Sequence, residues 1–354
     1  MNLRVRPALA VISLAALALI AGAPNPVRAQ FGRQQGNPFK SPPATVHSPH
    51  PRTYHDRHLK LDFVIDAADH SAKGVVTHYL SPLQDGLATV TFDAGANLNI
   101  KTVKINGKEV KFTHEGEALN ITPAAPLPAG KEVAVEIAYE MPRGGRGGGA
   151  NGAGGFTWID PRPNDPARRP GFWTQGETNT NHKWVPLYDW PNDKCTSETH
   201  TTVPAEWTVI GNGAESPVTV NAANHTKTYH WVMKQPHSTY LLSLAGGEVD
   251  VVKSSWSGIP LYYVVPKGEG GLAASSFGHT PDMLAFFSKR FGVKYPWPKY
   301  AQVLSYDFPG GMENVSATTL GPPQSVLADD RSSHRGPDSL ISHELGHQWF
   351  GDLV

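Results

Sequence analysis

Alternation of apolar and polar residues is the feature that most restricts how this chain can fold. From residue 59 the sequence reads LKLDFVID, with Leu59, Leu61, Phe63 and Ile65 at every second position. This period places the four side chains on one face of a β-strand. Further strand-like runs lie at residues 75–80, 87–92, 133–139, 199–203, 207–210, 226–232 and 240–244. Many short strands with turns between them predict an antiparallel sandwich or saddle.

Turn and helix signals refine this prediction. The pair Asn106-Gly107 separates two short apolar segments and accepts the positive φ angles of a tight turn, so it predicts a β-hairpin. After Trp256 the periodicity changes, and a helix is expected from Pro281 to Gly292. A strand is expected at 302–306, and a last helix near the end of the chain would be capped by Asp338.

Length and composition indicate a multi-domain globular protein. A chain of 354 residues with 39% hydrophobic and 18% charged residues usually forms two domains. We expect an all-β domain over residues 52–256, followed by a mixed α+β domain over residues 257–354. Cys195 is the single cysteine, which excludes an intramolecular disulfide. Because the net charge is zero, nothing favours nucleic acid as a partner.

The N-terminus has the features of a secretory signal. Arg4 and Arg6 precede an apolar stretch from Ala8 to Ala23, and small residues lead up to Ala29. This arrangement predicts cleavage after Ala29, so residues 1–29 would be removed and the protein would be periplasmic or secreted. An uncleaved or lipid-anchored form is the alternative. The stretch of about 16 residues is short for a membrane span, and no later segment is apolar enough to be one.

Two segments have the composition of flexible chain. Residues 30–51 are rich in Gln, Pro and Gly and are expected to form a linker. Residues 144–155 contain eight glycines and are expected to form a surface loop inside the β domain. A phosphate-binding loop is the alternative, but it requires a lysine and a helix directly afterwards, and neither follows.

The most informative run is His343-Glu344-Leu345-Gly346-His347. Residues four apart lie on the same side of a helix, so the imidazoles of His343 and His347 can bind one metal ion. Glu344 is offset by about 100° and is poorly placed to be a ligand. It is well placed to accept a proton from a water molecule that the metal activates. A chance occurrence on a solvated helix is the alternative.

Two neighbouring runs resemble those of a known family. With Gln348-Trp349-Phe350-Gly351-Asp352 after it, the histidine run resembles the zinc signature of M1 (gluzincin) aminopeptidases, His-Glu-x-x-His-x-Trp-Phe-Gly. Upstream, Gly310-Gly311-Met312-Glu313-Asn314 resembles their Gly-x-Met-Glu-Asn motif. The chemistry suits removal of N-terminal residues, because the carboxylate of Glu313 can accept hydrogen bonds from a peptide's terminal ammonium. Gly310 and Gly311 would let the backbone, with Met312, approach the substrate closely.

The resemblance also covers Thr174-Gln175-Gly176-Glu177, which is similar to a substrate-binding segment of the family's N-terminal domain. By this match Glu177 contacts the α-amine and Gln175 lines the same subsite. The resemblance implies a saddle-like β domain, a thermolysin-like metallopeptidase domain of which residues 257–354 are an incomplete part, and a helical C-terminal domain. It implies one Zn²⁺ per site and peptides with a free N-terminus as substrates.

In the family the third zinc ligand is a glutamate about nineteen positions after the second histidine, and a tyrosine that stabilises the oxyanion comes later still. Both positions lie past Val354. Residues 1–354 alone are therefore expected to bind zinc weakly and to be inactive, although the family that they resemble is one of zinc aminopeptidases. A non-catalytic fragment, a zinc endopeptidase of another gluzincin group and a β-sandwich adhesion or scaffold module are the alternatives. The sequence predicts neither an oligomeric state nor the preferred N-terminal residue.

Overall fold

The computed structural model describes residues 50–141, 154–165, 167–327 and 337–354. The predicted signal peptide, almost all of the predicted linker and residues 144–153 of the glycine-rich segment lie outside the described residues. None of the helices in the described part has the length and apolar character needed to cross a membrane.

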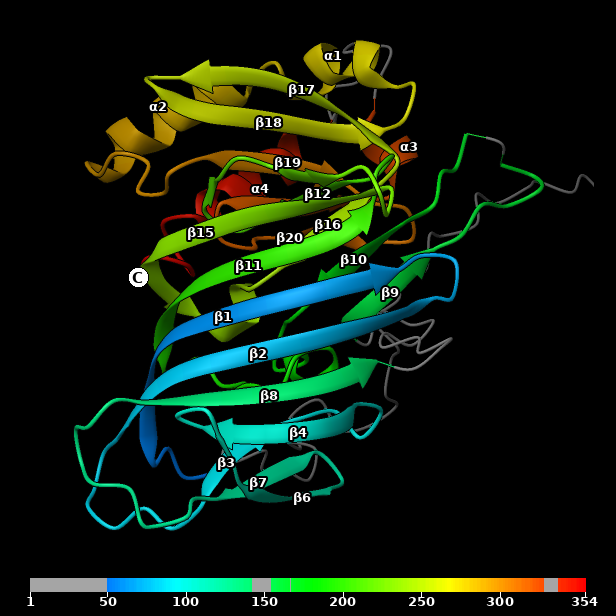
Figure 1. Ribbon diagram of the computed structural model, residues 1–354. Helices are drawn as coiled ribbons and strands as arrows, with labels where there is room; N and C mark the ends of the chain where they lie inside the picture. The colour runs from blue at the N-terminus through cyan, green and yellow to red at the C-terminus, as the bar shows by residue number, and fades with distance from the viewer. Residues whose placement is uncertain (1–49, 142–153, 166, 328–336) are drawn as a thin grey trace, which may run out of the picture. The chain divides into compact units, whose positions relative to one another are not determined.

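A nine-stranded sheet dominates the first part of the chain (Figure 1). Its order is β13-β15-β11-β1-β2-β8-β4-β5, with β14 paired to β15. The strands are β1 (Tyr54–Asp66), β2 (Ser71–Pro82), β4 (Asn99–Ile105), β5 (Lys108–Glu109), β8 (Val133–Met141), β11 (Lys194–Pro204), β13 (Ala214–Glu215), β14 (Thr219–Asn221) and β15 (Thr226–Ser238).

The period-two prediction is confirmed in this sheet. Leu59, Leu61, Phe63 and Ile65 of β1 are all buried in the core. The predicted hairpin is also present, with Asn106 and Gly107 at φ angles of 49° and 78° between β4 and β5. One feature differs from an antiparallel sheet: β1 pairs with β11 in parallel, and its other neighbour, β2, is antiparallel. A parallel pair can form here because more than a hundred residues separate the two strands, which is ample for a crossover connection.

Two smaller sheets complete the β domain. The four-stranded sheet has the order β12-β16-β10-β9, and the three-stranded sheet has the order β3-β7-β6. Their strands are β3 (Val90–Asp93), β6 (Lys111–Glu115), β7 (Ala118–Thr122), β9 (Gly155–Ile159), β10 (Gly171–Gln175), β12 (Thr208–Gly211) and β16 (Leu244–Gly247). The short 3₁₀ helix η1 (Asn181–Lys183) follows β10.

The last part of the described chain combines a five-stranded sheet with helices. The sheet has the order β17-β18-β19-β21-β20, and its two central pairings, β18–β19 and β19–β21, are parallel. Its elements are β17 (Val249–Trp256), β18 (Ile259–Pro266), η3 (Gly270–Leu272), α1 (Ala273–Phe277), α2 (Thr280–Phe291), β19 (Tyr300–Leu304), β20 (Gly310–Met312), β21 (Ala317–Gly321), α3 (Pro323–Val326) and α4 (Asp338–His347). The predicted helix is α2, and Gly292 ends it in the left-handed conformation.

This sheet begins earlier than the domain boundary expected at residue 257. β17 pairs along its whole length with β18, from Val249↔Pro266 to Trp256↔Ile259. The expected boundary falls inside the turn of this hairpin, where Ser257 and Gly258 have positive φ angles. The change in periodicity falls at this turn, whereas the hydrogen bonds between β17 and β18 show that the sheet already begins at Val249.

Two local predictions are wrong. Residues 240–244 are not one strand: the 3₁₀ helix η2 (Thr239–Leu241) precedes β16, and the amide of Leu242 donates to the carbonyl of Thr239. Asp338 does not cap α4, because Pro337 is the N-cap and the Asp338 carboxylate bonds Nδ1 of His279 instead. Arg168, in the segment between β9 and β10, is buried and paired with Asp307.

The buried His237 makes stability depend on pH. Its Nδ1 donates to the carbonyl of Ser238, so its Nε2 accepts a hydrogen bond from Oγ of Ser197 at 2.8 Å. Burial lowers the pKa of His237 from 6.5 to about 4. Between these pH values the unfolded chain binds a proton that the folded chain does not, so the free energy of unfolding falls as the pH falls.

We therefore expect His237→Gln to flatten this decline between pH 6.5 and pH 4, by up to about 3 kcal/mol. Urea unfolding at several pH values would measure it. Ser197→Ala is the matched control, since it removes the hydrogen bond but keeps the titrating group and should retain the slope. An equally steep decline in His237→Gln would show that other groups cause it.

Candidate active site

The two histidines of α4 are placed to share one metal ion. Nε2 of His343 and Nε2 of His347 lie 3.1 Å apart on neighbouring turns. Two nitrogen ligands at zinc-binding distance in a tetrahedral site lie about 3.3 Å apart, so the observed separation fits. Nδ1 of His347 donates to the carbonyl of Phe350 at 3.0 Å, which orients the ring and leaves Nε2 for a metal.

Glu344 lies beside this pair and is buried. One of its carboxylate oxygens lies within 4.8 Å of a ring nitrogen of each histidine. Burial raises the pKa of Glu344 to about 7, and the charge of Glu313 adds to the effect. A carboxyl with a pKa near neutrality can both accept and return a proton during a reaction.

Gly311 of β20 lies directly against the side chain of Glu344. A Cβ atom built on Gly311 would collide with the carboxylate of Glu344, so a larger residue here would displace that side chain. Gly310 has a φ of 107°, a conformation that also favours glycine. Met312 is buried against the core, and Glu313 follows at the end of β20. The strand therefore brings Glu313 alongside the helix that carries Glu344.

Tyr240 is a residue of this site that the sequence reasoning missed. Its hydroxyl lies 3.4 Å from Oε1 of Glu313 and 3.5 Å from the carbonyl of Gly351. Burial, followed by the charge of Glu313, raises the pKa of Tyr240, so the phenol keeps its proton as a donor. The position inside a 3₁₀ turn, rather than in the strand expected there, gives Tyr240 this contact.

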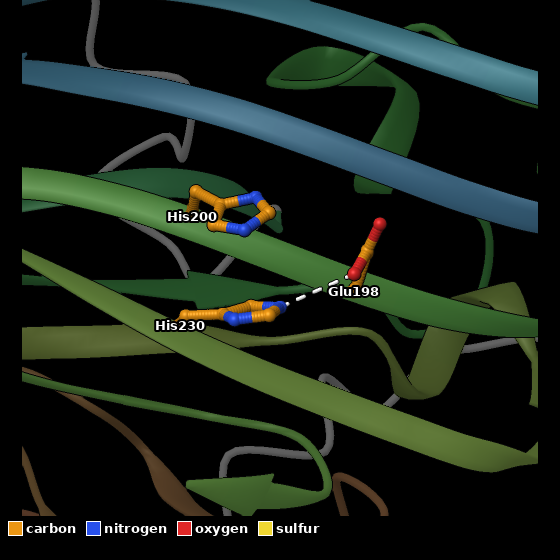
Figure 2. A group of neighbouring side chains, drawn as sticks. All are labelled: Glu198, His200 and His230. Carbon is orange, nitrogen blue, oxygen red and sulfur yellow. Dashed lines mark hydrogen bonds and ion pairs between the residues drawn. The ribbon is translucent and has the colours of Figure 1, made fainter. Parts of the chain in front are cut away.

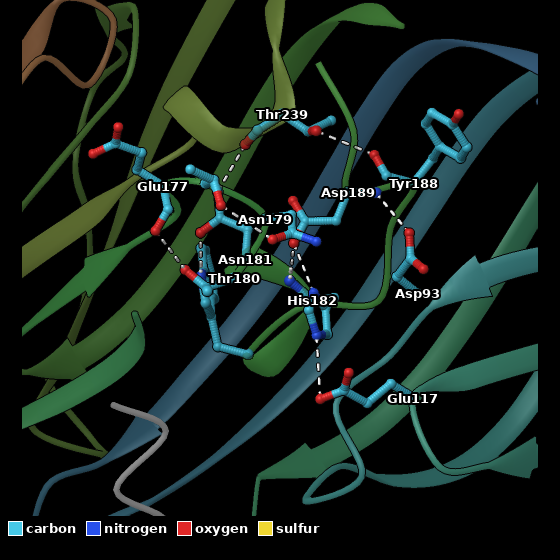
Figure 3. A network of polar contacts seen from close by, with 12 residues as sticks. Asp93, Glu117, Glu177, Asn179, Thr180, Asn181, His182, Tyr188, Asp189 and Thr239 are labelled. Carbon is cyan, nitrogen blue, oxygen red and sulfur yellow. Dashed lines mark hydrogen bonds and ion pairs between the residues drawn. The ribbon is translucent and has the colours of Figure 1, made fainter. Parts of the chain in front are cut away.

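Glu177 lies in the loop after β10, and its carboxylate points away from the polar network of that loop (Figure 3). Burial raises the pKa of its carboxyl, and Glu313 raises it further while His347 opposes the rise. Glu177, Glu313 and His347 are therefore close enough for their charges to interact. Gln175, at the end of β10, has a buried Oε1 with no hydrogen-bond partner among the described residues.

A buried polar network fixes this loop. Nδ2 of Asn181 donates to the carbonyls of Thr239 and Leu242, at 2.7 and 3.0 Å. The backbone amide and Nδ1 of His182 both bond Oδ2 of Asp189 (Figure 3). The loop that carries Glu177 is therefore tied to the turn that carries Tyr240.

Gln348, the residue after His347, holds the segment after β20 against the helix. Its Oε1 accepts from the amide of Ser316 at 2.8 Å, and its Nε2 donates to the carbonyl of Glu313 at 2.8 Å. In the sequence, Gln348 is notable only as part of the family-like run. Its side-chain amide, which lies between the second histidine and the aromatic pair Trp349-Phe350, was the available signal.

Hydrogen bonds also connect the same segment to the β domain. Nζ of Lys299, which is buried, donates to the carbonyls of Gly211 and Ser316 at 2.8 and 2.9 Å. Nδ2 of Asn212 donates to the carbonyl of Val315 at 2.8 Å. These contacts make the position of Glu313 depend on both parts of the chain.

We expect Gln348→Leu to lower the free energy of unfolding by about 2–4 kcal/mol, because it leaves the buried Ser316 amide and Glu313 carbonyl without partners. Chemical denaturation measures the change. Gln324→Leu on α3 is the matched control, since Gln324 is exposed and should change stability little. Equal stability of the two variants would show that the network around Gln348 contributes nothing.

Family models match most of the chain. The model of the peptidase M1 N-terminal domain matches residues 50–241, and that of the peptidase family M1 domain matches residues 275–354. The fold is similar to a crystal structure of an M1 zinc metallopeptidase from Deinococcus radiodurans, with a TM-score of 0.70 and 23% identity over 86% of this chain and 65% of that chain. A mutant of that enzyme bound to a Tyr-Ser-Ala substrate has a TM-score of 0.66 at 22% identity, over 86% of this chain and 66% of that chain.

Curated relatives show the same likeness. Leukotriene A-4 hydrolase of Xenopus laevis is 27% identical over 86% of this chain and 48% of its own length. Aminopeptidase B of Rattus norvegicus is 29% identical over 69% of this chain and 34% of its own length. Aminopeptidase N of Acetobacter pasteurianus is 30% identical over 51% of this chain and 52% of its own length. The chain thus spans about half or less of the length of these relatives, and it belongs to peptidase family M1.

Proposed function

We propose that this protein is a zinc aminopeptidase that removes N-terminal residues from peptides. The observation that carries the proposal is the meeting of three carboxylates from separate segments beside one histidine pair. Glu177 follows β10, Glu313 follows β20 and Glu344 lies on α4. Glu177 and Glu344 both have their pKa raised by the charge of Glu313.

His343 and His347 would hold the zinc ion. When bound, zinc polarises the carbonyl of the scissile peptide bond and makes a water molecule more acidic. Glu344 accepts the proton of the attacking water and passes it to the leaving amine. A buried carboxyl whose pKa is raised to about 7 has the protonation equilibrium that this double role requires.

Glu313 and Glu177 would bind the α-ammonium of the substrate. Burial raises the pKa of Glu177, and the charge of Glu313 raises it further. A cation bound between two such carboxylates stabilises their charged forms. Charge-assisted hydrogen bonds from the ammonium fix the first peptide bond next to Glu344 and exclude internal peptide bonds, which carry no charge. Gln175 lies on the same segment as Glu177, and its unpaired Oε1 is available to a substrate amide. The likeness to a metallopeptidase solved with a Tyr-Ser-Ala substrate supports a peptide as the substrate class.

Two further statements belong to this proposal. Residues 1–354 supply two imidazole ligands, whereas catalytic zinc sites normally have three protein ligands. We therefore expect these residues alone to hold zinc weakly and to turn over peptides slowly compared with a chain that carries a complete M1 domain. The signal-like residues 1–29 support export to the periplasm or the medium, which detection of the mature protein in those fractions would test.

Glu344→Gln should reduce kcat about 10²–10⁴-fold and leave bound zinc unchanged, because the amide cannot accept the proton. Release of amino-acid anilides by a chain with a complete M1 domain, together with metal analysis, measures both quantities. Glu132→Gln, at an exposed position outside the site, is the control. Undiminished turnover by Glu344→Gln would refute the role given to Glu344.

Glu313→Gln should lower kcat/KM for free peptides about 30- to 1000-fold, because the ammonium loses a charged acceptor. N-acetylated peptides should be poor substrates of both proteins, and Glu206→Gln should behave as wild type. Efficient cleavage of acetylated peptides by the wild-type protein would instead indicate an endopeptidase.

A further inference from the structure

A second group of metal-binding side chains lies on the nine-stranded sheet. His200 and Glu198 are on β11, and His230 lies directly opposite His200 on β15. The three side chains share the partly exposed face of the sheet, because Thr199 and Thr201 between and beside them are buried on the other face. Figure 2 shows the two imidazoles one above the other with the carboxylate of Glu198 beside them.

The distances suit a small cation. One ligand atom from each of the three residues lies within 4.8 Å of the others. Nε2 of His230 is 3.2 Å from Oε2 of Glu198, close to the roughly 3.4 Å between ligand atoms of a tetrahedral zinc site. The imidazoles stack with ring centroids 3.9 Å apart and planes inclined by 22°. Small side-chain rotations would bring the three ligand atoms onto one ion.

The surroundings resemble an outer shell of a metal site. Nδ1 of His200 lies 3.2 Å from Oδ1 of Asp62 but makes no hydrogen bond in the described structure. A carboxylate next to one ring nitrogen orients a histidine whose other nitrogen binds metal. On the far side of Glu198, Nε2 of His58 is 3.6 Å from Oε1, and Nδ1 of His58 bonds Oγ1 of Thr196.

We propose that Glu198, His200 and His230 form a binding site for Zn²⁺, with water in the fourth position. Two imidazoles and one carboxylate in a compact group favour zinc over magnesium or calcium, which prefer oxygen ligands. The site takes no residue from α4 and is independent of the function proposed above. A bound ion would join β11 to β15, and β15 leads directly into the turn that carries Tyr240.

The test uses a background in which the other histidine pair is removed, His343→Ala with His347→Ala. Equilibrium dialysis with ZnCl₂ should show one zinc per chain, and zinc should raise the Tm. Adding His200→Ala and His230→Ala should abolish both effects. CoCl₂ should give the absorption of four-coordinate cobalt in the background protein only. Asp62→Asn should weaken zinc binding about 10- to 100-fold, as expected for an outer-shell carboxylate.

Glu198→Gln is a second variant that keeps the size of the side chain, and it should weaken zinc binding at least about tenfold. Thr202→Ala is the matched control: it removes a hydrogen bond to Thr228 between the same two strands but no ligand, and should bind zinc like the background. The proposal is overturned if the background binds no zinc at micromolar concentrations, or if one zinc remains after both histidines are replaced. Circular dichroism of each metal-free variant excludes loss of zinc through unfolding.

Discussion

The candidate active site depends on a buried polar clamp around the segment that follows β20. Gln348 bonds this segment at Glu313 and Ser316, and Lys299 bonds it at Ser316. Buried backbone groups without partners cost about 1–3 kcal/mol each, so these side chains allow an irregular segment to be enclosed. Because Gln348 directly follows His347, the same contacts that satisfy the backbone also set where Glu313 lies relative to the histidine pair.

Concentrated negative charge is the second property of the site. Burial raises the pKa of Glu344, Glu177 and Asp352, and Glu313 raises each of them further. Such a cluster destabilises the folded chain unless cations bind. A divalent metal at the histidine pair and a substrate ammonium between Glu177 and Glu313 would each supply positive charge. The arrangement proposed to select the substrate is therefore also one that these cations would stabilise.

The β domain contributes a side chain to the candidate site and hydrogen bonds that position the site's other residues. Lys299 and Asn212 join its strand ends to the residues beside Glu313, and the loop after β10 delivers Glu177. Arg168, buried and paired with Asp307, adds another link between the β domain and the loop before β20. One hydrophobic core contains residues of both parts. The two regions that the family models match therefore pack together around the candidate site.

The sequence by itself determined the features that depend on local geometry. Alternation identified the buried face of β1, Asn106-Gly107 identified a hairpin, and the four-residue spacing of His343 and His347 places their rings together on any helix. The family-like runs predict Glu313 and Glu177 as site residues, and in the structure the charges of Glu313 and His347 both act on Glu177.

Only the tertiary structure decided which distant segments meet. Tyr240 and Glu313 are 73 positions apart, and Lys299 and Gly211 are 88 apart. His200 and His230 show no metal-ligand spacing in sequence, yet strand pairing sets them directly opposite each other. Periodicity reports which face a residue occupies, but not which strand will be its neighbour or whether a short apolar segment becomes a strand or a 3₁₀ turn. Those outcomes depend on packing and hydrogen bonds between segments that are far apart along the chain.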